Sequence, residues 1–536
     1  MRQAHRQLQR WLIVILCIIA FTWRLQGLSR QSLWSDEIDA VYFALRDLPQ
    51  ALSMFFKTGQ NGPLFFLSLR PWLQLVGSSE FALRYPAVLF SLLSVPLLWQ
   101  VARRLMPGRT AVSSAGRPAQ LLRLTVGDGP LLTAVLLAAN PYQIWYGQDG
   151  KMYAEITFLA LLAAWLWMRG IGRGSWRPWL GYLIVVSIGI YTHLLMVLLI
   201  PLGLLWFLIS WPQSNRHRLG YLSAFSGLTL PYLPLIAWQW TLLISPEQLT
   251  ALPARPFGDV VTSTLLNQSL GVQQPGDLLQ LAPVFFLGAA GLSLGYLEIA
   301  PRQNDTLARL AAWRRHLLIV TWLIAPLLGI YLISLRQPVF NARYVIWIAP
   351  AVMMLVALGI QLLWHSRGSM AKLVAVVLAV YTLLFWITLG QQQKSQVIKP
   401  DLRAAVSYIA QNRSPDSLLI LQTPHLEVAY RYYSGDQGTD PFWGSDERLG
   451  RYSGAIWTNN GLDDDEAREQ VDQEMREVTA GASDIWIMLS EAETWDKRQL
   501  MLRWLNDEGV LIDQVRYQDA QVRHYRLPRV AFQPHW

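Results

Sequence analysis

The chain has 536 residues, 53% of them hydrophobic, and its mean hydropathy is positive, which is too apolar for a soluble protein of this length and indicates a polytopic membrane protein. Residues 1–390 carry 29 Lys and Arg against 13 Asp and Glu, whereas residues 391–536 carry 16 against 23. Because the basic residues fall between apolar segments, the net charge of +9 does not indicate nucleic-acid binding. The single cysteine, Cys17, excludes a disulfide within the chain.

The first apolar segment, at about 11–27, follows Arg2, Arg6 and Arg10 as the core of a signal peptide would. No small-x-small cleavage site follows it, so we expect an uncleaved anchor. A spanning helix needs about 20 mostly apolar residues. About eleven segments are candidates, near 11–27, 82–101, 124–140, 153–168, 179–192, 194–210, 219–241, 278–297, 317–335, 345–364 and 373–390.

The region at about 28–80 is expected to form an outer loop with interfacial helices. Its stretch from Leu64 to Val76 is apolar but short, and it contains Arg70 and Pro71, which favours an interfacial helix over a span.

The connections between the spans differ in basic residues. With a cytoplasmic N-terminus, the inside connections hold 19 Lys and Arg in 77 positions and the outside connections hold 9 in 114. This asymmetry sets orientation in membranes. We therefore expect Asp36, Asp149, Arg343 and the C-terminal tail to lie outside the cytoplasm.

Residues 391–536 change character and predict a soluble extracytoplasmic α/β domain. Helices are expected at 401–412, 464–479 and 496–508, and strands at 417–422, 484–490 and within 510–527. The acidic run from Asp463 to Glu466 resembles a metal cluster but is interpreted as the start of a helix.

Three outer stretches join charged residues to aromatic ones. They are Trp34-Ser35-Asp36-Glu37-Ile38-Asp39, Tyr146-Gly147-Gln148-Asp149-Gly150-Lys151-Met152-Tyr153, and Asn341-Ala342-Arg343-Tyr344. An aromatic belt with snorkelling basic side chains would explain Lys151 and Arg343 equally well. It explains Asp36 and Asp149 less well, because short carboxylates cannot snorkel. Carboxylates and cations on one face suit a transfer from a lipid phosphate, with a carboxylate taking a hydroxyl proton and cations stabilising the departing phosphate.

In these stretches the sequence resembles the GT-C glycosyltransferases that use polyprenyl-phosphate sugars, the group that includes protein O-mannosyltransferases and the lipid A aminoarabinose transferase. The resemblance covers about the first 390 residues and consists of seven matches in order. They are the Asp36-Glu37 pair, Gly62-Pro63-Leu64-Phe65-Phe66, Glu80-Phe81-Ala82-Leu83-Arg84-Tyr85-Pro86, Asn140-Pro141 to Trp145-Tyr146, Gln148-Asp149 to Met152-Tyr153, Tyr191-Thr192-His193 and Arg343-Tyr344.

The resemblance implies a role for each matched residue. Asp36 would be the general base for the acceptor hydroxyl, and Glu37 would support it or bind the acceptor. Asp149 would hold hydroxyls of the acceptor or the sugar. Lys151 and Arg343, with Tyr344 beside it, would bind the lipid phosphate.

Two further residues are weaker candidates for the donor site. Arg84 would reach the phosphate, with a helix-packing or headgroup contact as the alternative. His193 would reach the same cavity, although a lone membrane histidine is commonly a structural hydrogen-bonding residue.

The sequence departs from the family pattern at Asn61-Gly62, where relatives often show His-Pro. One potential metal ligand is thereby lost, and no His, Cys, Asp and Glu set has ligand spacing. Asp36 with Glu37 or Asp39 could bind Mg²⁺ or Mn²⁺, but no cofactor is predicted and a metal-free site is favoured.

Taken together, these patterns predict an α-helical polytopic membrane protein of GT-C type with about eleven spans (1–390) and a C-terminal α/β domain (391–536). The expected function is inverting transfer of a hexosyl or pentosyl unit from a polyprenyl-phosphate donor to an extracytoplasmic lipid, protein or cell-envelope glycan. The expected location is the plasma (inner) membrane. Two rivals are a transporter or flippase of lipid-linked sugars, which would show inverted repeats and mid-membrane charges, and a scaffolding protein whose acidic tail binds a partner.

Overall fold

The structure is a computed structural model. It describes residues 2–56, 62–106, 126–173, 175–211, 213–229, 236, 240, 244, 253–272, 282–293, 306–422, 425–435, 449–451, 462–490 and 498–528. Asn61 and parts of the segments predicted at 124–140, 219–241, 278–297 and 496–508 lie outside the described residues. The chain forms two units, which are described separately.

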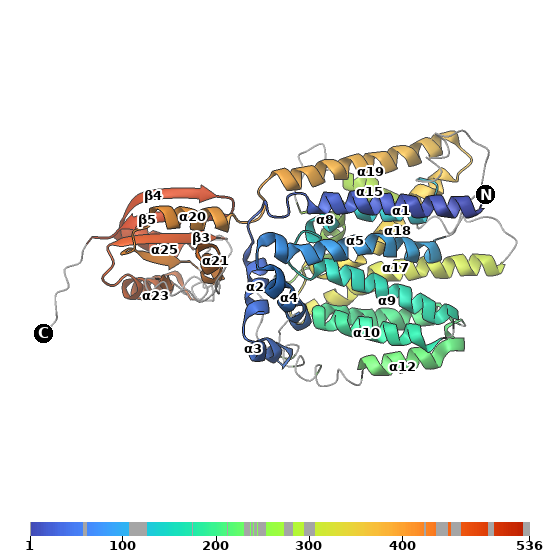
Figure 1. The fold of residues 1–536 in the computed structure, drawn as a ribbon, viewed down its shortest axis with the longest axis horizontal. Helices are drawn as coiled ribbons and strands as arrows, with labels where there is room; N and C mark the ends of the chain where they lie inside the picture. Colours follow the sequence, from blue (N-terminus) through green and yellow to red (C-terminus); the bar gives the residue numbers. More distant parts are fainter. Residues whose placement is uncertain are drawn as a thin grey trace. The chain divides into compact units, whose positions relative to one another are not determined.

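The first unit comprises Met1–Gln26, Asp47–Leu69 and Arg84–Gln393 and is helical throughout its described part. Its long helices run in nearly the same direction (Figure 1). The α-helices that lie wholly or mostly in this unit are α1 (Arg2–Leu25), α3 (Leu48–Ser53), α5 (Glu80–Leu105), α7 (Gly129–Ala139), α8 (Pro141–Tyr146), α9 (Tyr153–Arg173), α10 (Trp176–Thr192), α11 (Leu199–Ile209), α12 (Arg218–Thr229), α14 (Phe257–Leu270), α15 (Ala282–Leu292), α17 (Thr306–Ser334), α18 (Ala349–Trp364) and α19 (Ser369–Ser395). Short 3₁₀ turns are η1 (Met54–Phe56), η2 (Leu194–Leu198), η3 (Ser214–His217) and η7 (Ala342–Ile348).

Six described helices are long and apolar enough to cross a membrane, lying within α1, α5, α9, α17, η7–α18 and α19. The most buried is the η7–α18 helix, with 94% of its apolar window buried. α18 packs against α7, α15 and α17, so its apolar character on all sides fits a helix surrounded by other helices. The predicted multi-pass helical architecture is confirmed, whereas the number eleven remains a prediction.

The second unit comprises Gly27–Arg46, Arg70–Leu83 and Lys394–Trp536. It contains a five-stranded sheet in the order β2-β1-β3-β5-β4, in which β1 pairs in parallel with β2 and β3, and β5 pairs antiparallel with β3 and β4. The strands are β1 (Leu418–Leu421), β2 (Leu449–Arg451), β3 (Asp484–Ser490), β4 (Val510–Tyr517) and β5 (Ala520–Arg526). Its helices are α2 (Ser35–Leu45), α20 (Leu402–Asn412), α21 (His425–Ser434), α23 (Asp464–Val478) and α25 (Leu500–Glu508), and α4 (Pro63–Val76) is shared between the units.

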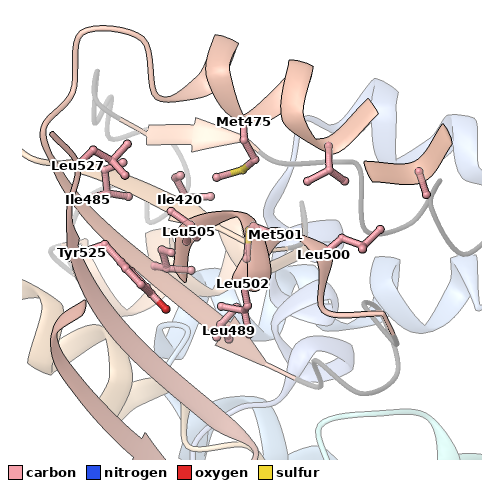
Figure 2. Packing of buried hydrophobic residues seen from close by; sticks show 13 residues of the cluster. Ile420, Met475, Ile485, Leu489, Leu500, Met501, Leu502, Leu505, Tyr525 and Leu527 are labelled. Atoms are coloured by element: carbon pink, nitrogen blue, oxygen red, sulfur yellow. The ribbon is translucent and has the colours of Figure 1, made fainter. Parts of the chain in front are cut away.

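Side chains alternate between the two faces of the sheet along β3. Different helices pack against these two faces. Ile485, Ile487 and Leu489 point into an apolar cluster with Met475 of α23 and Leu505 of α25 (Figure 2). Trp486 points to the other face, where it contacts Tyr408 of α20. The predicted small C-terminal α/β domain is confirmed as a sheet domain, and the boundary at residue 390 stays a prediction.

The acidic run from Asp463 to Glu466 forms the N-cap and first turn of α23. Asp463 accepts hydrogen bonds from the backbone N–H groups of Asp465 and Glu466, at 3.0 and 2.9 Å. The interpretation of this run as the start of a helix is therefore confirmed.

Several elements escaped the sequence-based prediction. α14 lies in a stretch taken for an outer connection, and α21 and β2 lie in the tail between predicted elements. α14 carries only a weak apolar pattern, so its helix is fixed by packing against α8, α15 and α17.

Candidate functional site

Asp36 and Glu37 occupy the first turn of α2 in the second unit. α2 begins after Trp34, whose carbonyl accepts hydrogen bonds from the N–H groups of Glu37 and Ile38, at 2.9 and 3.0 Å. Negative charge is favoured at this position, because the unpaired N–H groups of a first turn carry partial positive charge. Glu37 is fully buried whereas Asp36 is half-buried, so the two carboxylates of the motif have different environments.

Glu37 forms a buried ion pair. Its Oε2 lies 2.9 Å from Nζ of Lys399, whose side chain is 8% exposed. The Lys399 ammonium also lies 5.9 Å from the centre of the Trp34 ring. To bind a divalent cation, Glu37 would have to give up this lysine. Among the residues that the structure describes, no group of three or more His, Cys, Asp and Glu is placed to hold a metal ion.

In the first unit, Asp149 lies in the short connection between α8 and α9. Asn140 fixes the start of α8, since its Oδ1 accepts from the Gln143 N–H at 3.0 Å. Asp149 is 0% exposed. Burying a carboxylate is costly unless it is paired or hydrogen-bonded, so a buried Asp149 depends on the polar groups around it.

Arg343 lies among the aromatic rings at the start of α9 and η7. Its guanidinium carbon is 5.5 Å from the centre of the Tyr153 ring and 5.6 Å from that of Tyr344. The two tyrosines stack, with ring centres 6.4 Å apart and planes at 22°. Asn341 accepts from the Arg343 N–H at 3.2 Å, which fixes the backbone here. A planar guanidinium can both stack on aromatic faces and form bidentate hydrogen bonds to carboxylate or phosphate groups.

His193 completes this cluster. Its ring centre lies 5.2 Å from that of Tyr344 and 6.3 Å from that of Tyr153. Nδ1 accepts from the Leu195 N–H at 3.3 Å, so the neutral ring carries its proton on Nε2. Within the described part of the chain, Nε2 has no hydrogen-bond partner, and neither has the buried Oγ1 of Thr192. Two adjacent residues, Thr192 and His193, therefore each have a buried polar atom with no hydrogen-bond partner in the described part of the chain.

Lys151 and Gly62 lie on the α4 side of the first unit. Lys151 Nζ is 5.4 Å from the centre of the Phe66 ring. Gly62 has φ +75°, which proline cannot adopt. A Cβ at Gly62 would lie 2.4 Å from Cε of Met152 and 3.0 Å from the Thr192 carbonyl oxygen. At the position where the family often has the proline of His-Pro, the backbone of Gly62 therefore lies close to Met152 and Thr192, which are neighbours in sequence of Tyr153 and His193.

Of the predicted residues, Arg343, Tyr344 and His193 lie together in the first unit with Tyr153. Arg84 is 2% exposed within α5 of the same unit. Asp36 and Glu37 belong to the second unit. The chemical role of each residue remains a prediction.

Arg24 is a residue that sequence reasoning passed over. Its fully buried guanidinium donates from Nε to Ser91 Oγ at 2.8 Å and from Nη1 to the Ala138 carbonyl at 3.1 Å. Gln148, next to Asp149, donates to the Arg24 carbonyl at 2.6 Å. Arg24 therefore joins α1, α5 and α7 behind the Asp149 connection. Its position at the end of an apolar run, with no charged neighbour, gave no signal of this role.

The fold of the chain is similar to the folds of two solved structures. The chain matches the crystal structure of ArnT from Cupriavidus metallidurans bound to undecaprenyl phosphate with a TM-score of 0.54 and 12% identity, over 96% of this chain and 97% of that one. It matches the archaeal oligosaccharyltransferase AglB from Archaeoglobus fulgidus, in complex with an inhibitory peptide and a dolichol-phosphate, with a TM-score of 0.54 and 10% identity, over 98% of this chain and 74% of that one.

In sequence, residues 119–238 match the family model for dolichyl-phosphate-mannose-protein mannosyltransferase. No curated protein matches the chain. The resemblance to the GT-C superfamily of polyprenyl-phosphate-dependent glycosyltransferases is thereby confirmed. The matched segment contains Asp149, Lys151, Tyr153 and His193, so it includes part of the cluster around Arg343.

Proposed function

We propose that the protein transfers a sugar from a polyprenyl-phosphate carrier to an acceptor outside the cytoplasm. The observation that carries this proposal is the cluster of Arg343, Tyr153 and His193, which offers a cation and a buried N–H donor. Tyr153 and His193 lie in the segment matched by a mannosyltransferase family model, and Arg343 lies outside it. Two structural relatives contain lipid phosphates, undecaprenyl phosphate in ArnT and dolichol-phosphate in AglB.

In the proposed reaction, Asp36 takes the proton of the acceptor hydroxyl, and the acceptor oxygen attacks the anomeric carbon of the donor sugar. The bond from this carbon to the phosphate oxygen breaks, and its electron pair leaves with the phosphate. Arg343 and Lys151 stabilise the charge that develops on the phosphate, while the Nε2–H of His193 donates to one of its oxygens. Asp149 accepts hydrogen bonds from sugar or acceptor hydroxyls.

Direct attack inverts the anomeric configuration and requires no glycosyl-enzyme. Its transition state resembles an oxocarbenium ion. The sugar is a hexose or pentose, and the acceptor is a lipid, a protein or a cell-envelope glycan. The basic inside connections support a cytoplasmic N-terminus and an extracytoplasmic C-terminal domain in the plasma (inner) membrane.

The test is a reconstitution of the purified full chain in vesicles with radiolabelled polyprenyl-phosphate sugars and an extract of envelope acceptors. The proposal expects label to move to an acceptor while free polyprenyl phosphate accumulates. Movement of the intact lipid-linked sugar between leaflets with no free polyprenyl phosphate would support the flippase alternative and contradict the proposal.

A further inference from the structure

In the second unit, the residues that follow α19 hold the loop that precedes Asp36. Gln31 Oε1 accepts hydrogen bonds from the backbone N–H groups of Ile398 and Lys399, at 3.0 and 2.9 Å. Ser32 Oγ donates to the Pro400 carbonyl. We name residues 29–33 together with residues 395–403 the clasp. These bonds fix the backbone from which the Lys399 side chain extends.

A second set of bonds holds the far end of the clasp. Arg403 donates to the carbonyls of Ser29 and Arg30, at 3.3 and 3.1 Å, and pairs with Glu80 at 3.2 Å. Tyr433 accepts from the Leu33 N–H at 2.6 Å and donates to Glu80 at 2.9 Å. Burial and the neighbouring Glu80 raise the pKa of Tyr433, so its hydroxyl remains a donor.

The Lys399–Glu37 pair lies where the clasp meets α2. Both side chains are buried, with Glu37 0% and Lys399 8% exposed, so the attraction is little weakened by solvent. Successive residues of a helix point about 100° apart at 3.6 residues per turn. Holding Glu37 against Lys399 therefore sets the rotation of the first turn of α2 and with it the direction of Asp36.

We propose that Lys399 is a positioning residue, which orients Asp36 through the buried ion pair with Glu37. The inference rests on the proposed function, in which Asp36 takes the acceptor proton. In this proposal, the segment after the last predicted span contributes a residue that orients Asp36. Glu37 then helps to orient Asp36 and does not take the proton itself.

The experiment compares the full-length wild type with Lys399→Met, Glu37→Gln and the double variant. Lys372→Met serves as the matched control, because Lys372 is exposed in α19. Lys399→Met is expected to lower kcat about tenfold to a hundredfold, since a displacement of about 1 Å at a reacting group has an effect of that size. The KM for the lipid-linked donor should stay within about twofold, because the donor contacts assigned to Arg343 are unchanged. The fall in kcat in the double variant should be smaller than the product of the falls in the two single variants, because both substitutions remove the same ion pair.

Hydrogen–deuterium exchange provides a readout that does not depend on the reaction. Residues 35–41 should exchange faster in Lys399→Met and in the double variant, while Lys372→Met should match the wild type. Unchanged exchange at residues 35–41 would overturn the positioning role, even if the wild type proves to have no transferase activity. Faster exchange with an unchanged kcat, or losses that multiply in the double variant, would also overturn it. An inactive wild type whose exchange responds as predicted would contradict only the proposed function.

Discussion

The guanidinium of Arg343 lies 5.5 Å from the centre of the Tyr153 ring, although the two residues come from distant parts of the sequence. Tyr153 begins α9 and Arg343 lies in η7, and these elements pack together. The contact places a permanent cation beside the connection that carries Asp149 and Lys151. In the proposed function, the guanidinium of Arg343 pairs with the negative charge of the lipid phosphate at this position.

Replacing Arg343 with lysine should weaken binding of the lipid phosphate, even though the charge is kept. A lysine has a single ammonium and cannot combine stacking on Tyr153 with two parallel bonds to an anion. We expect the Kd of polyprenyl phosphate to rise about tenfold, which corresponds to about 1.4 kcal/mol. Isothermal calorimetry on detergent-solubilised protein measures this. Arg336→Lys, at an exposed residue of the preceding loop, is the control, and an equal loss in both variants would argue against the assignment of Arg343.

Two substitutions of His193 test whether its ring acts as a hydrogen-bond donor or only in packing. Gln carries an N–H that can replace Nε2–H, whereas Phe fills the space but loses both that donor and the acceptor for Leu195 N–H. His193→Gln should retain at least tenfold more transfer activity than His193→Phe, since losing one donor to developing charge costs about 2.7–4 kcal/mol. His316→Phe, at a buried histidine of α17, should remain close to wild type. Equal activity of the two His193 variants would show that the ring acts only in packing.

Gly62→Ala should damage the protein for two separate reasons. The new Cβ meets Met152 and the Thr192 carbonyl, and φ of +75° costs a non-glycine residue about 1–2 kcal/mol. We expect a lower Tm and reduced transfer. Gly62→Ala combined with Met152→Ala should recover part of the loss, because the shortened side chain makes room while the backbone strain remains. Gly172→Ala, where a Cβ meets nothing within 4 Å, should be neutral, and a neutral Gly62→Ala would contradict the close approach.

The long apolar helices could be predicted because each is a continuous run that is readable without its neighbours. The span expected at 153–168 lies within α9, and the one expected at 373–390 lies within α19. The helix α2 was harder to foresee. It buries Ile38 and Val41 but carries Asp36, Glu37 and Asp39, so its sequence predicts only a place within the outer loop and interfacial helices expected at about 28–80.

Contacts between distant residues could not be predicted from local patterns. Lys399 stands in a polar stretch after the last span, and nothing near it in sequence indicates an ion pair with Glu37. Arg24 stands at the end of an apolar run, and nothing near it in sequence indicates that it joins three helices. The positive φ of Gly62 was likewise not evident, since the sequence showed only that His-Pro was absent.

Asp36→Asn tests directly whether Asp36 is the general base, because asparagine keeps the size of the side chain while losing the ability to take a proton. Asp39→Asn, which makes the same change four residues from the start of α2, is the matched control. Purified variants are compared by single-turnover transfer from a labelled polyprenyl-phosphate sugar, with donor binding measured in parallel. We expect Asp36→Asn to bind the donor like the wild type and to lose transfer by at least about a hundredfold, the lower range for a general base, while Asp39→Asn retains transfer. Wild-type transfer by Asp36→Asn would contradict the assignment of Asp36 as the general base.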